Sequence, residues 1–401
     1  MEKNKKVTLN ACGIVAEYNP FHNGHAYQIK ELKGRLGIDL IVVVMSGDFL
    51  QRGEPAIVDK WSRAEAAIRS GADVVIEMPL EYSVQSSDVF AEGAIDLLHS
   101  LAVKCYSFGA ESGDSFDFMK TAKVFLEREE EVDHLFLKQK NNGLSYPAQM
   151  EKVMKEIFPQ SPIDFSLPNN QLGIAYEKIN QAYSAPMKPI VIRRKGANYH
   201  AQNISDATIA SATAIRKLIL SNPVDSIEKY VPQPMFKLLG NSEYVDWNKL
   251  WPLLRYQIHL QSVEQLREVY EVREGIEYRL KEKLLLAESF EEYMNLVKTK
   301  RYTRTRIQRI FVYILLQWTK DGIAEKLKNE ASGRILGFSE IGRTYLGQIK
   351  KRGQSTLITN LNRNNQEKWA YNHVASHLHS FLSSSDYKNN NEFQKKPIYI
   401  K

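Results

Sequence analysis

The chain has 401 residues, which is too long for one compact module and predicts two or three domains. With 43% hydrophobic and 25% charged residues, the composition excludes a disordered or collagen-like chain. The net charge of +7 is uneven, because residues 301–401 hold 18 Lys and Arg against 7 Asp and Glu, whereas residues 11–190 are net acidic. This distribution predicts that the C-terminal part meets a polyanion, although a solvated basic surface would produce it too.

Short β-branched runs alternate with helical patterns from residue 7 to about residue 194. The runs that predict strands are 7–16, 40–46, 73–77, 103–108 and 189–193. Apolar residues at helical spacing predict helices at 25–36, 61–70, 89–101 and 171–183. Apolar strands separated by helices are typical of a parallel sheet that is covered on both faces. The first half is therefore predicted to be a doubly wound α/β domain.

The second half shows a different pattern, because no strand signal follows Ser205. Amphipathic helices are predicted at 214–220, 250–260, 263–272, 276–287, 290–296 and 305–318. We therefore expect two domains, an α/β domain over residues 1–219 and a basic helical domain over residues 220–401.

The exit from the first strand reads Asn19-Pro20-Phe21-His22-Asn23-Gly24-His25. Asn19-Pro20 forces a turn and Gly24-His25 opens a helix, so backbone N–H groups and the positive end of the helix dipole point into the loop. This predicts a phosphate site, in which His22 and His25 donate to the charge that builds during in-line displacement. Surface or capping histidines and half of a metal site are the alternatives, but no third ligand of the His-Glu-x-x-His kind follows.

A second motif, Ser211-Ala212-Thr213-Ala214-Ile215-Arg216, opens a later helix. Ser211 and Thr213 suit the N-terminus of a helix, and Arg216 lies about one turn further on, where its guanidinium can hold outgoing phosphates. A lone match of this kind is more simply a helix cap. Together with the first motif, it predicts a nucleotide site.

Three further features follow predicted strands or precede helices. Gly109 ends the fourth strand at the edge where open α/β sheets bind ligands. Asn169 and Asn170 precede a helix, where capping and ligand binding are equally good interpretations. The run Arg193-Arg194-Lys195 leaves the fifth strand at the same edge as His22, which favours an anion contact.

The two motifs together look like the signature of the HIGH-motif nucleotidyltransferase superfamily, whose members attack the α-phosphate of a nucleotide and release pyrophosphate. Over nearly its full length the sequence resembles the bacterial tRNA(Met) cytidine acetate ligase family. The resemblance is carried by segments 16–25, 45–56, 71–73, 77–79, 108–111, 167–170, 211–216 and 301–309. The superfamily's paired serines are Ser211-Ala212 here, and the run 193–195 leaves open which cation takes the family's arginine position.

The resemblance implies a Rossmann-like nucleotidyltransferase domain, a helical tRNA-binding domain and a two-step reaction. Acetate attacks the α-phosphate of ATP to give acetyladenylate and pyrophosphate. The acetyl group then passes to the exocyclic amine of the wobble cytidine of elongator tRNA(Met). We expect Mg²⁺ with the triphosphate, although no carboxylate cluster marks a metal site.

The resemblance also implies the site residues. The predicted catalytic residues are His22, His25, Ser211, Thr213 and Arg216. The predicted ATP-binding residues are Val15, Ala16, Glu17, Tyr18, Asn19, Pro20, Phe21, His22, Asn23, Gly24, His25, Ala26, Tyr27, Gln28, Gly109, Asn170 and Arg194. The predicted tRNA-binding residues are Arg301, Arg306, Arg309, Lys350, Lys351 and Arg352, since cations among aromatics suit RNA.

Two other functions remain possible at this point. A different adenylyltransferase of the superfamily, acting on a small molecule, would not need a helical domain of this size. A non-catalytic RNA-binding protein would predict eroded motifs, and here both are intact. Only Cys12 and Cys105 occur, and the longest apolar run, 310–316, is too short for a membrane helix. We therefore expect a soluble, cytoplasmic enzyme with no membrane partner.

Overall fold

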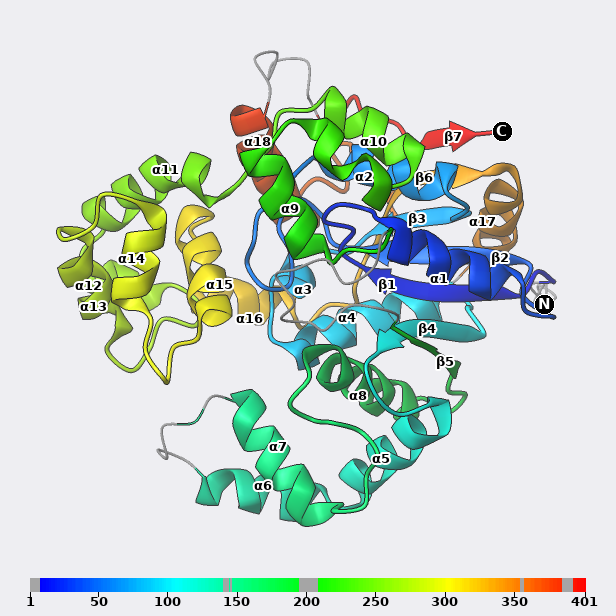
Figure 1. Ribbon diagram of the computed structural model, residues 1–401, viewed down its shortest axis with the longest axis horizontal. Helices are drawn as coiled ribbons and strands as arrows, with labels where there is room; N and C mark the ends of the chain where they lie inside the picture. Colours follow the sequence, from blue (N-terminus) through cyan, green and yellow to red (C-terminus); the bar gives the residue numbers. More distant parts are fainter. Residues whose placement is uncertain (1–7, 140–143, 145, 195–207, 354–356, 384–391) are drawn as a thin grey trace.

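The computed structural model describes residues 8–139, 144, 146–194, 208–353, 357–383 and 392–401 (Figure 1). Within these ranges, one sheet has the strand order β5-β4-β1-β2-β3-β6-β7. The strands are β1 Ala11–Ala16, β2 Leu40–Met45, β3 Val74–Glu77, β4 Cys105–Ala110, β5 Lys188–Arg193, β6 Arg334–Ser339 and β7 Ile398–Ile400. β1 to β5 are parallel, as predicted, and β6 is antiparallel to β3. The predicted α/β fold is confirmed.

The sheet separates two hydrophobic cores because alternate residues of its strands point to opposite faces. In β2, Leu40, Val42 and Val44 join one core, and Ile41, Val43 and Met45 join the other. The first core is covered by α4 Ser87–Ser100, α5 Ser115–Glu127, α6 Glu129–Lys138, α7 Tyr146–Ile157 and α8 Pro168–Gln181. The second is covered by α1 Asn23–Lys33, α2 Lys60–Arg69, α9 Ala212–Ser221, the 3-10 helix η1 Val224–Tyr230 and α10 Gln233–Gly240.

A third core belongs to a helical body that lies at one end of the molecule in Figure 1. Its helices are α11 Trp247–Leu260, α12 Val263–Glu268, α13 Ile276–Leu284, α14 Phe290–Val297, α15 Arg304–Leu315 and α16 Lys320–Lys326. Phe49, from the loop after β2, and Leu80, from α3 Leu80–Ser83, are buried in the same core. The helical body is therefore packed directly onto the α/β body.

The expectation that no strand follows Ser205 is wrong. After the helical body the chain returns to the sheet, where β6 pairs with β3 and β7 pairs with β6. α17 Glu340–Arg352 packs its Tyr345 and Ile349 into the first core, and α18 Ala370–Ser383 packs Ala375 into the third. β6 contains a glycine and begins with a buried arginine, so its apolar run is not distinct from the amphipathic helical pattern around it. The domain boundary at residue 219 remains a prediction.

A buried ionic cluster attaches the returning segment to the α/β body. The Lys60 ammonium, 1% exposed, lies 2.9 Å from Glu77, 3.0 Å from Glu392 and 3.7 Å from Asp48. Arg334 pairs with Glu392, and Ser376 of α18 donates to Asp48 at 2.6 Å. Burial would lower the pKa of Lys60, but the three carboxylates outweigh it and hold that pKa above its ordinary value. Lys60 therefore stays charged at the junction of three chain segments.

The loop between β2 and α2 touches the helical body through Gly53. This residue has φ +77°, and a Cβ on it would lie 2.3 Å from the backbone nitrogen of Arg309 in α15. Only glycine allows this approach. In the parts of the chain that the structure describes, no helix is both long enough and apolar enough to cross a bilayer.

Candidate active site

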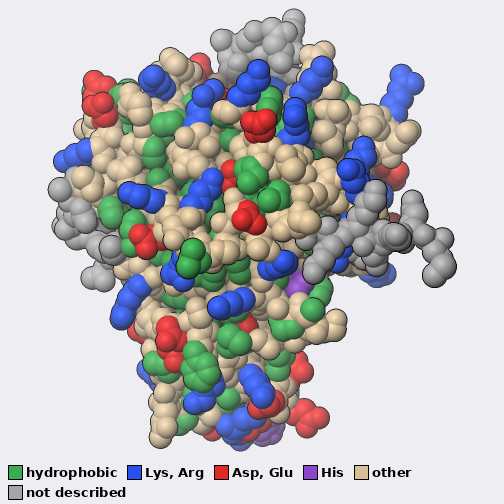
Figure 2. Space-filling model, turned by 90° about the vertical axis from the view of Figure 1, so that its right-hand side faces the viewer, with side chains coloured by type: hydrophobic (Ala, Val, Ile, Leu, Met, Phe, Trp, Pro, Cys, Tyr) green, Lys and Arg blue, Asp and Glu red, His purple; other side chains and the backbone are tan. Residues whose placement is uncertain are grey.

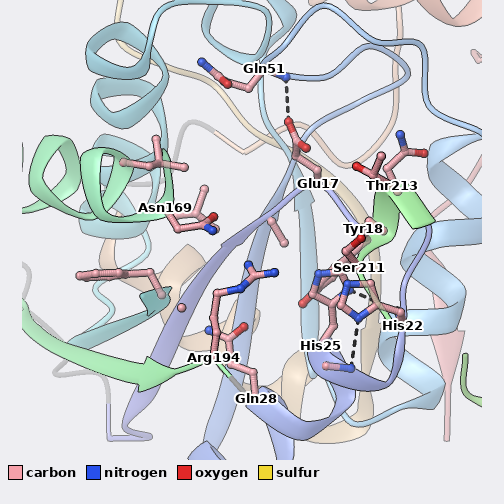
Figure 3. Close-up of a pocket in the computed structure, with 18 of the residues that line it drawn as sticks. Glu17, Tyr18, His22, His25, Gln28, Gln51, Asn169, Arg194, Ser211 and Thr213 are labelled. Carbon is pink, nitrogen blue, oxygen red and sulfur yellow. Dashed lines mark hydrogen bonds between the residues drawn. The ribbon is translucent and has the colours of Figure 1, made fainter. Parts of the chain in front are cut away.

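A cavity of about 270 Å³ opens at the carboxyl ends of β1, β4 and β5 (Figure 3). Parallel sheets bind ligands at this edge. The loop after β1, the loop after β2, and the N-termini of α1 and α9 form most of its wall, with residues of α4 and α8 completing it. The two sequence motifs, almost 200 residues apart in the chain, thus line one space.

The first motif builds the start of α1 around its two histidines. His22 is the N-cap, and its Nδ1 accepts the backbone N–H of Gly24 at 3.1 Å. In return, the backbone N–H of His22 donates to Nδ1 of His25 at 3.2 Å. The two rings stack with centroids 3.6 Å apart. A Cβ at position 24 would lie 2.9 Å from the His22 ring, so glycine is what allows the cap.

These hydrogen bonds fix the tautomer of both rings. Because each Nδ1 accepts a proton from the backbone, each neutral ring carries its own proton on Nε2. Both histidines are therefore hydrogen-bond donors at Nε2 and line the cavity. Burial, followed by the charge of Arg194, lowers the pKa of His22 to about 3. Burial and the neighbouring His22 ring also hold the pKa of His25 well below its ordinary value.

We expect the His22 ring to stay neutral between pH 8 and pH 5, measured by its NMR ring resonances with a His22→Ala variant for assignment. Below pH 6.5 this histidine binds a proton in the unfolded chain but not in the folded chain. Its contribution to the free energy of unfolding is therefore complete above that pH. It should fall on acidification by about 1.4 kcal/mol per pH unit for this histidine. A titration midpoint near 6.5 would contradict the hydrogen-bond assignment.

The second motif forms the start of α9. The Ser211 hydroxyl caps the helix by accepting the backbone N–H of Ala214 at 3.1 Å. Arg216 donates from Nη1 to the Asn19 carbonyl at 2.8 Å and from Nη2 to Glu54 at 2.7 Å. Ser211, Thr213 and Arg216 all line the cavity. The structure thus brings together the five predicted catalytic residues.

Two buried donors in the cavity wall have no partner among the described residues. They are the hydroxyl of Tyr18 and the side-chain nitrogen Nδ2 of Asn19. Leaving a buried donor unpaired costs about 1–3 kcal/mol.

The predicted ATP-binding residues are only partly in contact with the cavity. Those that line it are Val15, Ala16, Glu17, Tyr18, Asn19, His22, Gly24, His25, Gln28, Gly109 and Arg194. Pro20, Phe21, Asn23, Ala26, Tyr27 and Asn170 do not line it. Of the cation run 193–195, Arg194 lines the cavity, Arg193 does not, and Lys195 lies outside the described residues.

The neighbouring asparagines have separate positions. Asn170 is fully buried, and its amide accepts from the Glu111 backbone N–H at 3.0 Å and donates to Ser112 Oγ at 2.8 Å. These bonds hold the loop after β4. Asn169 lines the cavity instead and donates to Glu111. Because both residues belong to one helical turn, the sequence did not show which of them faces the ligand.

Several cavity residues were missed by the sequence analysis. The loop after β2 contributes Gln51, Arg52 and Glu54. An apolar part of the wall comes from Phe90, Phe108, Leu172, Tyr176 and Ile192. The signal for the loop was present, since segment 45–56 was part of the family resemblance and leaves a parallel strand at the same edge. The apolar residues carry no such signal, because apolar residues in strands and helices are expected in any hydrophobic core.

The predicted tRNA-binding residues lie on two separate helices. Arg306 and Arg309 are in α15, within 3.8 Å of Glu274 and 3.3 Å of Glu271 respectively, and Arg301 is exposed just before this helix. Lys350, Lys351 and Arg352 are exposed at the end of α17. Figure 1 shows α15 and α17 at opposite sides of the molecule. Figure 2, which views the side that holds α17, shows scattered Lys and Arg with Asp and Glu among them.

Comparison with known proteins decides the family. Residues 9–395 match the family described as HIGH Nucleotidyl Transferase. A Geobacillus sp. (strain WCH70) protein described as tRNA(Met) cytidine acetate ligase is 41% identical over 360 residues, covering 88% of this chain and 89% of that protein. The chain belongs to the tRNA(Met) cytidine acetate ligase family. A Bacillus subtilis (strain 168) member of the tRNA(Met) cytidine acetate ligase family is 36% identical and covers 88% of each chain.

Solved structures agree with this assignment. Apo Thermotoga maritima TmcAL superposes with a TM-score of 0.89 at 26% identity, covering 98% of this chain and 100% of that one. TmcAL of the same organism bound with alpha-thio ATP gives a TM-score of 0.88 with the same coverage. The resemblance to the tRNA(Met) cytidine acetate ligase family that the motifs predict is therefore confirmed.

Proposed function

We propose that this chain activates acetate with ATP and transfers the acetyl group to the wobble cytidine of elongator tRNA(Met). The observation that carries the proposal is the single cavity in which both motifs meet, with two neutral histidines as donors. The substrates are supported by relatives described as tRNA(Met) cytidine acetate ligase and by the Thermotoga maritima relative bound with alpha-thio ATP. The site residues in the following paragraphs are part of this proposal.

In the first step an acetate oxygen bonds to the α-phosphorus and the bond to the bridging oxygen of pyrophosphate breaks. Acetate is already an anion, so this step needs no general base. The work of the site is to orient two anions and reduce their repulsion. His22 and His25 would donate from Nε2 to the reacting phosphate, and the start of α9 with Arg216 would hold the outgoing phosphates.

We expect Mg²⁺ to enter with the nucleotide. Among the described residues, no group of three His, Cys, Asp or Glu side chains is placed to hold a metal ion. Phosphate oxygens are themselves ligands that Mg²⁺ prefers, with water completing the shell. When bound, the ion would neutralise charge on the triphosphate.

One experiment separates this function from its alternatives. The protein is incubated with ATP, labelled acetate and total tRNA, and the label is then located by nuclease digestion and chromatography. We expect label in N4-acetylcytidine of elongator tRNA(Met), and, in a parallel reaction with labelled pyrophosphate, acetate-dependent exchange of label into ATP. Exchange without label in tRNA would indicate a small-molecule acceptor. Binding of tRNA without exchange would indicate a non-catalytic RNA-binding protein.

The tRNA surface is expected to lie beside the cavity mouth, because the wobble base must enter the cavity. α15 touches the cavity loop where Gly53 meets Gln308 and Arg309, and Arg301 lies exposed just before this helix. We expect Arg301→Glu to weaken tRNA binding several-fold and lower the salt slope of log Kd by about 1. Lys350→Glu on α17 is the comparison variant, for which we expect a smaller effect. Equal loss in both would extend the tRNA surface to α17.

A further inference from the structure

The acetyl-transfer step of the proposed function, on which this inference rests, requires a proton acceptor that acetate activation does not. An exocyclic cytidine amine that attacks a carbonyl carbon must lose a proton as the new bond forms. Acetate carries no such proton when it attacks phosphorus. A base beside the cavity would therefore matter for acetyl transfer alone.

The two histidines are poorly suited to this role. Nδ1 of each ring is occupied by a backbone N–H, at 3.1 Å for His22 and 3.2 Å for His25. Nε2 carries the proton and is a donor. Neither ring therefore has a free acceptor nitrogen, and both can act toward phosphate as hydrogen-bond donors.

Among the described residues that line the cavity, only Glu17 and Glu54 are carboxylic acids. Glu54 accepts the guanidinium of Arg216 at 2.7 Å, so its charge is already paired. In the described part of the chain, Glu17 Oε1 accepts from a neutral donor, the backbone N–H of Gln51, at 3.0 Å. Glu17 is therefore the carboxylic acid better suited to proton transfer.

The backbone at Glu17 is held in place by a buried arginine. Its backbone carbonyl accepts from Nη1 of the fully buried Arg63 at 2.7 Å, and the same nitrogen donates to Ser46 at 3.1 Å. Figure 3 shows Glu17 and Gln51 toward one end of the cavity and Arg194 and Gln28 toward the other. The side chain thus lies apart from Arg194.

The surroundings of Glu17 favour a base. Burial raises the pKa of its carboxyl, with Arg52 opposing and Glu54 adding to the rise. Arg216, Arg63 and the Tyr176 hydroxyl are the other titratable groups that face it. A carboxylate with a raised pKa is a stronger proton acceptor than a solvated one. The aromatic rings of Phe90 and Tyr176 line the same cavity and could contact a flat base.

We propose that Glu17 is the general base of acetyl transfer. Its carboxylate takes a proton from the cytidine amine as the nitrogen–carbon bond forms. The bond between the acetyl carbon and the phosphate oxygen of acetyladenylate breaks, and AMP leaves with that electron pair. Glu17 releases its proton to solvent after the products depart.

Glu17→Gln tests this by separating the two half-reactions. We expect acetate-dependent exchange between pyrophosphate and ATP to fall at least about tenfold less than acetyl transfer, because only the transfer step needs a proton acceptor. Single-turnover transfer from preformed, labelled acetyladenylate to tRNA should fall about 10²–10⁴-fold. Glu17→Asp should recover part of the rate. Transfer by wild type should rise with pH to a plateau, and the residual rate of the Gln variant should lack this dependence.

The matched control is Glu65→Gln, which removes a carboxylate paired with Arg69 on the surface of α2. It should leave both half-reactions unchanged. Wild-type transfer by Glu17→Gln would overturn the proposal and point to the AMP phosphate as the proton acceptor. Loss of exchange in both Glu17 variants would overturn it in favour of a role in the nucleotide site. Absence of exchange in the wild type would instead refute the proposed function itself.

Discussion

Replacing His22 or His25 by alanine is expected to lower acetate-dependent ATP/pyrophosphate exchange by about 10²–10³-fold, because each change removes an Nε2–H donor from the developing charge. Binding of tRNA should be retained, since the RNA surface belongs to other elements. Exchange is measured with labelled pyrophosphate, and tRNA binding by filter retention of the same preparations.

The His22 change also removes the cap of α1, which alone costs about 1 kcal/mol of stability. His22→Asn separates the two effects, because asparagine caps helices well but lacks the ring donor. It should restore the melting temperature without restoring exchange. His134→Ala, on the exposed side of α6, is the neutral control. Full exchange activity in either alanine variant would refute the catalytic assignment.

Replacing Lys60 by methionine is expected to destabilise the fold by about 3–5 kcal/mol, because three carboxylates then remain buried near one another without their shared cation. The measurement is denaturant unfolding followed by circular dichroism and tryptophan fluorescence. Trp61 donates to Glu392 within this cluster, so its emission reports on the junction.

Lys155→Met provides the comparison, since Lys155 pairs with Glu151 on the surface of α7. Exposed pairs contribute little, so its unfolding curve should match that of wild type. Equal stability of the Lys60 and Lys155 variants would show that the buried cluster is not what attaches the C-terminal segment.

The parallel part of the sheet could be predicted from sequence because its strands are buried on both faces. Segments such as 41–45 are apolar at every position, which marks them even without their partners. The histidine motif was equally visible, because its turn, glycine and helix start are neighbours in the chain. Local geometry there determines the chemistry, including the backbone N–H groups that orient both rings.

The remaining features depend on contacts between distant segments. No local sequence pattern predicts that Arg334 begins a strand or that it pairs with Glu392. Arg306 and Arg309 look like an RNA-binding pair in the sequence, yet Glu274 and Glu271 lie beside them in the fold. The choice between Asn169 and Asn170 likewise depends on how α8 is rotated against β4. These are questions of register and rotation, which single-sequence patterns do not resolve.

The late return of the chain to the sheet has a consequence for protein synthesis. β3 emerges from the ribosome about 260 residues before its neighbour β6, and Lys60 emerges more than 300 residues before Glu392. Throughout that interval the nascent chain carries an open strand edge, a form prone to mispairing, and a cation without all its buried partners. The α/β body can therefore be completed only after β6 and Glu392 have emerged, and a chain that stops before Arg334 would leave the edge of β3 open.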